Sequence, residues 1–157
     1  MAELPLPASE TRPVLSEDTQ TFVTFWLGEH LFGLPIAEVV EINRKMEITP
    51  VPLAPAYIKG IINLRGQVLT TVDLAERLGL QVEAPRAYNL IVRTEDEERI
   101  SFLVEKIGDI LEVPSKNVEE PPERIEGVER KFVRHVCQLP ERLLVILNVR
   151  EVLQDSG

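Results

Sequence analysis

Cysteine is almost absent from the sequence, since Cys137 is the only one among 157 residues. An internal disulfide is therefore excluded, and so is a zinc site built from several thiolates. A chain without disulfides is typical of a reducing compartment, so we expect a cytoplasmic protein.

Long apolar runs are missing too. No stretch approaches the roughly 18–20 residues of a membrane-spanning helix, and residues 1–20 lack the pattern of a signal peptide, so no membrane insertion is expected.

Positive charge is in short supply. Lysine and arginine number 17 against 26 aspartates and glutamates, which leaves a net charge of −9. Nucleic acids and anionic lipid surfaces select basic patches, so this balance disfavours both as partners. The 44% of apolar residues is nevertheless enough to build a hydrophobic core in a chain of this length.

Catalytic and cofactor-binding motifs are equally scarce. The eight glycines form no phosphate-binding loop, and no serine lies in a nucleophile elbow. The acidic stretches 94–99 and 118–129 are interleaved with arginines and predict solvated surfaces, so we expect no metal and no cofactor. One alternative stays open. His135 and Cys137 share a face of an extended strand, which allows a Cys–His dyad in a small β-barrel enzyme or ligand-binding module.

The residues that are present form short β-strands. Runs of β-branched and aromatic residues between turns predict roughly nine or ten strands. The clearest cover residues 22–27, 31–34, 58–64, 68–72, 89–93, 100–104, 109–113, 132–139 and 142–149. Short helices are predicted over 35–42, 73–80 and 148–154, with Asp73 and Asn148 as N-caps and Gly79 closing the second. Prolines at alternate positions make residues 48–55 an extended edge segment, and residues 114–131 are predicted to form a polar surface loop.

This pattern predicts an all-β fold. A small barrel uses five or six strands, so we expect two small β-barrels that share a hydrophobic core. The expected lobes cover about residues 20–85 and 86–155, and a proline-containing tail, residues 1–19, is expected to be disordered. The predicted core includes Phe25, Leu34, Ile62, Val72, Ile91, Phe102 and Ile146.

Arg65 is unusual because it lies between Leu64 and Gly66 within an otherwise apolar, β-rich stretch. Gly66 can adopt a positive φ and turn the chain tightly, so we expect Arg65 at a strand end. Two interpretations remain open. The guanidinium either anchors a protein partner or ties the loop down, for example through Glu41.

Three stretches of the sequence carry a family resemblance. They read “FGLPIAEVVEI” (32–42), “IKGIINLRGQVLTTVDL” (58–74) and “RLLVILNVREVL” (142–153). Together they resemble the CheW family of chemotaxis coupling proteins, and the resemblance extends from about Thr21 to Leu153. It implies two five-stranded, SH3-like β-barrels around a common core, with short helices that include one at the C-terminus.

The resemblance also implies a function. Members of the family are non-catalytic adaptors that couple the cytoplasmic tips of methyl-accepting chemoreceptors to the histidine kinase CheA, whose regulatory domain is itself CheW-like. One end of the protein would pair with the kinase barrel, and a groove between the lobes would take the helical hairpin of the receptor. The adaptor would be cytoplasmic and recruited to membrane-associated receptor arrays.

Four residues of this chain match family positions for partner binding: Val39, Glu41, Gly60 and Arg65. The match favours Arg65 as a displayed anchor. The chain departs from the family pattern where Thr70 and Thr71 replace a frequent proline, and where “RHVCQL” (134–139) replaces a glycine-rich stretch. Which receptors and which pathway it serves, flagellar, twitching or developmental, stays open.

Overall fold

The computed structural model describes residues 18–154, which form an all-β fold with short helices, so the predicted fold class is confirmed. The strands are β1 (Thr19–Leu27), β2 (His30–Pro35), β3 (Val39–Arg44), β4 (Ile58–Leu64), β5 (Gln67–Asp73), β6 (Tyr88–Arg93), β7 (Arg99–Val104), β8 (Lys106–Pro114), β9 (Val118–Glu119), β10 (Val133–Gln138) and β11 (Leu143–Leu147). The helices are α1 (Leu74–Leu78) and α2 (Val149–Leu153), with 3-10 turns η2 (Ile36–Glu38), η3 (Ser115–Asn117) and η4 (Arg130–Phe132).

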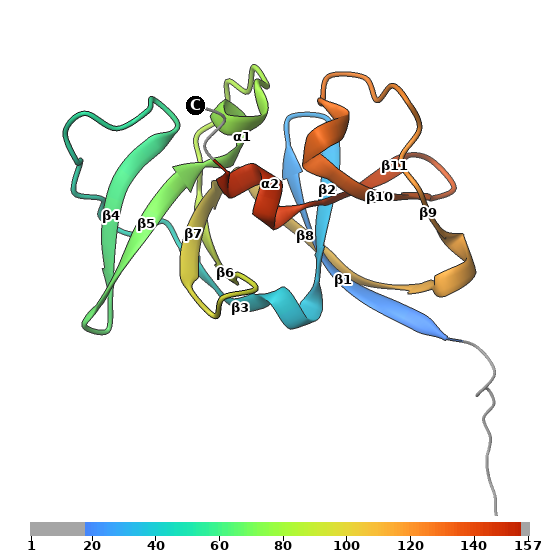
Figure 1. Ribbon diagram of the computed structural model, residues 1–157, viewed down its shortest axis with the longest axis horizontal. Coiled ribbons are helices and arrows are strands. Elements are labelled where there is room, and N and C mark those ends of the chain that lie inside the picture. The colour runs from blue at the N-terminus through green and yellow to red at the C-terminus, as the bar shows by residue number, and fades with distance from the viewer. Residues whose placement is uncertain (1–17, 155–157) are drawn as a thin grey trace, which may run out of the picture.

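The strands form two sheets that stand side by side, with α1 and α2 near the middle of the molecule (Figure 1). The six-stranded sheet has the order β8-β1-β2-β11-β10-β9, and the five-stranded sheet has the order β3-β6-β7-β5-β4. Neighbouring strands are antiparallel except for two parallel pairs, β2 with β11 and β5 with β7. The two sheets correspond to the two predicted barrels.

Each sheet takes strands from both halves of the chain. In the six-stranded sheet β1 and β2 pair with β8 and β11, and in the five-stranded sheet β6 and β7 pair with β3 and β5. The expected consecutive lobes, residues 20–85 and 86–155, therefore do not coincide with the sheets. Pairs such as Gly33 with Ile146 are set by the burial of a shared core, which the spacing of strands along the sequence does not reveal.

The largest hydrophobic core lies between the two sheets. It joins β1 and β2 of one sheet to β6 and β7 of the other, for example through Phe25 and Phe102, and α1 and α2 pack against it. Smaller clusters fill the six-stranded sheet around Phe22 and the five-stranded sheet around Ile62. All seven predicted core residues are at most 2% exposed, so that prediction is confirmed.

The two α-helices begin directly after β5 and β11, and both have the predicted N-caps. The Asp73 side chain accepts a hydrogen bond from the backbone N–H of Glu76 at 3.2 Å, and Asn148 accepts one from Glu151 at 3.2 Å. Gly79 ends α1 in the left-handed conformation, at φ 77°. A polar cap at the start and a glycine at the end define α1 as a helix of little more than one turn.

Two predictions of secondary structure were wrong. The predicted helix 35–42 ends at Glu38, and Val39 begins strand β3, because β-branched residues at 39, 40 and 42 pack better on a sheet than in a helix. The predicted loop 114–131 contains η3, β9 and η4. Of the predicted tail, residues 1–17 lie outside the described residues, and Thr19 already belongs to β1.

Candidate partner-binding site

Arg65 occupies the two-residue turn that joins β4 to β5. Leu64 pairs with Gln67, and both central residues have positive φ, 50° for Arg65 and 89° for Gly66. The Asn63 side chain accepts a hydrogen bond from the Gly66 N–H at 2.8 Å and holds the turn. Tight hairpins favour glycine or asparagine at such positions, since most other side chains are strained by about 1–2 kcal/mol there. An arginine in this place suggests that its side chain is needed.

The Arg65 guanidinium contacts Glu41 on β3. Its Nη2 lies 2.8 Å from each carboxylate oxygen of Glu41, and the Asn43 side chain donates to the same carboxylate at 3.0 Å. The hydrogen bond from Arg65, together with the one from Asn43, lowers the pKa of Glu41 below its usual range. The Arg65 side chain is 68% exposed. Glu41 thus orients the guanidinium, while most of the Arg65 side chain stays exposed to solvent.

The Arg65–Glu41 ion pair also connects the two edges of the five-stranded sheet. Glu41 lies on edge strand β3, and Arg65 leaves the end of edge strand β4. Between these edges lies the hydrophobic cluster around Ile62 and Ile91. The contact therefore fits both interpretations of Arg65, because it closes the sheet and presents the guanidinium at the surface.

Val39 and Gly60 have different roles in this region. Val39 is half-buried on β3, pairs with Val92 and packs against the shared core. Gly60 is buried at an irregularity of β4 and has φ 143°. A Cβ at Gly60 would lie 2.0 Å from the Thr49 carbonyl oxygen. Gly60 consequently contributes a close approach of two backbones, whereas Glu41 and Arg65 contribute side chains.

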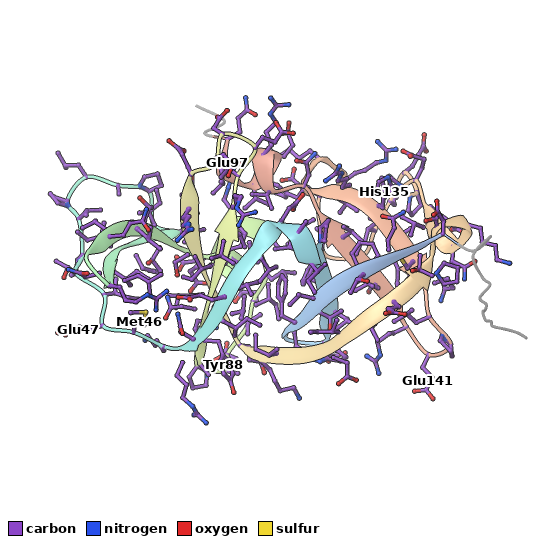
Figure 2. All side chains as sticks on the ribbon, turned by 90° about the horizontal axis from the view of Figure 1, so that it is seen from below. Met46, Glu47, Tyr88, Glu97, His135 and Glu141 are labelled. Carbon is purple, nitrogen blue, oxygen red and sulfur yellow. The ribbon has the colours of Figure 1, made fainter. Side chains whose placement is uncertain are left out.

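A groove between the two sheets was not anticipated residue by residue. It has a volume of about 540 Å³ and is lined by η2, the β6–β7 hairpin, β10 and α2. Arg134 of β10 donates a hydrogen bond to the Glu38 carboxylate of η2 at 3.2 Å and so links the two sides of the groove. Partial burial raises the pKa of Glu38, and Arg134 opposes this shift. Glu97, labelled in Figure 2, belongs to the hairpin on its rim. No local sequence pattern identifies the residues that line this groove, because Glu38 and Arg134 belong to opposite halves of the chain.

An exposed apolar loop lies on the five-stranded sheet. Residues 50–55 include Val51, which is partly exposed, and Leu53, which is fully exposed with a positive φ of 61°. The preceding Thr49 pairs with Ile61 of β4, so the predicted edge segment is held against the sheet. A large apolar side chain in a strained conformation on the surface marks a candidate protein contact.

Comparison with known proteins identifies the family. The model of the CheW-like domain matches residues 21–157. The chain belongs to the CheW family. Chemotaxis protein CheW of Rhizobium meliloti is 32% identical over 143 residues, covering 90% of this chain and 92% of that protein. Chemotaxis protein CheW of Treponema pallidum is 28% identical over 150 residues, covering 92% and 88%.

A solved CheW structure has the same fold. The scaffolding protein TtCheW from Thermoanaerobacter tengcongensis superimposes with a TM-score of 0.83 at 25% identity, covering 89% of this chain and 96% of that one. As a CheW family member, the chain is a non-catalytic adaptor of chemotaxis-type signalling. Within residues 18–154, no helix has the length and apolar character needed to cross a bilayer.

The dyad alternative receives no support from the family or from the local geometry. Cys137 is fully buried, and burial raises the pKa of its thiol to about 11, which disfavours a reactive thiolate. His135 faces Glu120 instead, at 3.7 Å between Nε2 and Oε2. Cys137 packs with Phe22 and Ile146 as a core residue. The other histidine, His30, has Nε2 3.0 Å from the Glu126 carbonyl oxygen.

Proposed function

We propose that this CheW-like protein couples the cytoplasmic tips of methyl-accepting chemoreceptors to the regulatory domain of the histidine kinase CheA. It would act in the cytoplasm, recruited to membrane-associated receptor arrays. The observation that carries the proposal is the Arg65–Glu41 pair, since Arg65 is held in a strained turn and oriented outward by a carboxylate at 2.8 Å. A preorganised arginine loses little conformational entropy when it binds a partner.

The receptor contact is assigned to β3, the β4–β5 turn and the groove between the sheets. Val39 follows η2, which lines the groove, and Ile36 of η2 is 47% exposed beside it. An exposed apolar side chain next to a charged groove suits an amphipathic helical hairpin, which buries an apolar stripe and leaves a polar rim. Gly60 supports this surface indirectly by letting the Thr49 backbone approach β4.

The kinase contact is assigned to the exposed loop of residues 50–55. Leu53 offers an apolar anchor on the five-stranded sheet, and the CheA regulatory domain, a CheW-like domain itself, would present a complementary barrel surface. Replacing Leu53 with serine should leave folding intact, because the side chain is fully exposed, and should weaken binding of the isolated CheA regulatory domain.

Reconstitution tests the proposal. Purified protein is mixed with receptor-containing membranes and CheA, and co-sedimentation and receptor-dependent kinase activity are measured. We expect the wild type to sediment with both partners, and Arg65→Ala to lose receptor coupling. Lys116→Ala is the matched control, because Lys116 is an exposed cation in η3 of the other half of the chain. If the wild type binds neither receptor membranes nor the CheA regulatory domain at tens of micromolar, on the order of the weak end of specific interfaces, the proposal is wrong.

A further inference from the structure

Arg77 of α1 reaches across to α2, the helix that follows the other sheet. Its Nε donates to the Val152 carbonyl oxygen at 2.6 Å, and its Nη2 donates to those of Gln154 at 2.6 Å and Glu151 at 3.4 Å. Figure 1 shows α1 and α2 together near the middle of the molecule. α1 continues from β5 of the five-stranded sheet and α2 from β11 of the six-stranded sheet. One side chain therefore links the helices of both sheets.

The same guanidinium lies between two aromatic rings. It is 4.7 Å from the ring centre of Tyr57 and 4.9 Å from that of Phe132. Tyr57 is tied to the five-stranded sheet, since its carbonyl accepts from the Asp73 N–H at 2.7 Å. Phe132 is tied to the start of α2 in the same way, with the Asn148 N–H at 2.8 Å. A guanidinium this close to two aromatic ring centres makes cation–π contacts, so Arg77 bridges the sheets through these contacts as well as through hydrogen bonds.

Arg77 supplies much of the hydrogen bonding at the C-terminal end of α2, where the Gln154 N–H also donates to the Glu151 carbonyl at 3.3 Å and Leu153 packs against the core. The helix has five residues, and the last carbonyls of any helix lack partners within it. A helix this short is marginal without tertiary contacts. Val149 and Val152 anchor one face in the shared core, and Arg77 satisfies carbonyls at the end with a cation, which the helix dipole also favours.

α2 is also a wall of the groove between the sheets. Val149, Leu153 and Gln154 line it, and Gln154 is one of the residues whose carbonyl binds Arg77. We infer that Arg77 is a positioning residue, which fixes α2 and the fit of the two sheets and thereby sets the shape of the groove for a helical partner. The inference rests on the proposed function in assigning the receptor to this groove, whereas the effect of Arg77 on α2 is independent of any partner.

The first test measures amide hydrogen exchange in the isolated full-length protein. In Arg77→Ala, exchange in α2 should be at least about tenfold faster, while β1 and β7 in the shared core keep their protection. Lys131→Ala is the control, because the Lys131 ammonium lies 5.1 Å from the same Phe132 ring but Lys131 donates no hydrogen bond to α2. Arg77→Lys retains the charge without the planar guanidinium, and its α2 amides should also exchange faster than those of the wild type.

Unchanged α2 exchange in Arg77→Ala, or full protection of α2 in Arg77→Lys, would overturn the inference. If Arg77→Ala does not fold, Arg77→Lys decides the test.

The second test separates positioning from general stability. Arg77→Lys should bind receptor membranes several-fold more weakly. Its affinity for the isolated CheA regulatory domain should stay within about twofold of wild type, because Arg77 contacts α2, Tyr57 and Phe132 and not residues 50–55 themselves. Equal losses toward both partners would indicate general destabilisation and refute the positioning role, as would faster α2 exchange with unchanged receptor binding. Failure of the wild type to bind receptor membranes would refute the proposed function instead, and the exchange result would still decide whether Arg77 holds α2.

Discussion

Arg65→Ala and Arg65→Gly together separate recognition from folding. The alanine variant removes an exposed side chain but keeps a Cβ at φ 50°, so the strain of the turn remains. Its folding stability should change by no more than about 0.5 kcal/mol, as at most surface sites. Glycine removes the strain, which is about 1–2 kcal/mol, against about 0.5–1 kcal/mol of added entropy in the unfolded chain. Arg65→Gly should therefore be as stable as the wild type or more stable by up to about 1 kcal/mol.

Receptor coupling should follow a different order. If the guanidinium is an anchor, both variants lose about 2 kcal/mol of binding free energy, which is about thirtyfold in affinity. Arg65→Glu should bind the receptor still more weakly, because it adds repulsion against a partner carboxylate. Arg65→Lys should restore little of the receptor binding, because an ammonium lacks the planar set of N–H donors of a guanidinium. Denaturant unfolding and titration with receptor membranes measure the two quantities. A large loss of stability in Arg65→Ala, with binding restored in Arg65→Gly, would show that the residue acts through the turn. Full activity in both variants would make it a bystander.

Four further predictions follow from single contacts. Gly60→Ala should be destabilising and should displace the segment around Thr49, seen as faster amide exchange at Ile61, since the added Cβ would lie 2.0 Å from a carbonyl oxygen. Phe102→Ala should lower the free energy of unfolding by about 3–5 kcal/mol, measured by denaturation, because the ring is fully buried. Cys137 should react with a thiol reagent at pH 8 only on unfolding, because its side chain is fully buried and burial also raises the pKa of its thiol to about 11. The pKa of Glu41 is lowered in the folded protein, so Glu41 contributes to stability above the pKa of an unfolded glutamate. This contribution is lost as the pH falls through the lower, folded pKa. An acid titration followed by NMR of the Glu41 side chain measures that folded pKa.

Much of the local structure was predictable because its causes are local. The span of β4, the Asp73 cap and the glycine that ends α1 each depend on residues within a few positions of one another. The buried faces were predictable for the same reason, as Phe25 and Phe102 lie within runs of strong β-formers. The helix predicted to continue through Val39 failed because proline and alanine start a helical turn that the following β-branched residues do not extend.

The site was predictable only in part. The turn around Gly66 pointed to an exposed Arg65, and Glu41 was named as a candidate partner, but only the fold brings β3 against the β4–β5 turn. The family resemblance implied a groove between the lobes, but the residues that line it and the Arg77 contacts were missed, because they join residues on either side of the chain midpoint. Such contacts depend on which strands pair across the sheets, and strand spacing carries no information on that.

The interleaving of the two halves has a mechanical consequence for an adaptor. Since β1 and β2 belong to the six-stranded sheet while β3 to β5 belong to the five-stranded sheet, the chain crosses between the sheets at η2 and again after β7. Two lobes joined by a single linker would be free to move relative to each other, which is the usual expectation for small interfaces. Here two crossings, a shared core and the Arg77 bridge oppose such motion. We therefore expect the groove and the five-stranded sheet to move together as one nearly rigid body, as the proposed coupling of a receptor to a kinase requires.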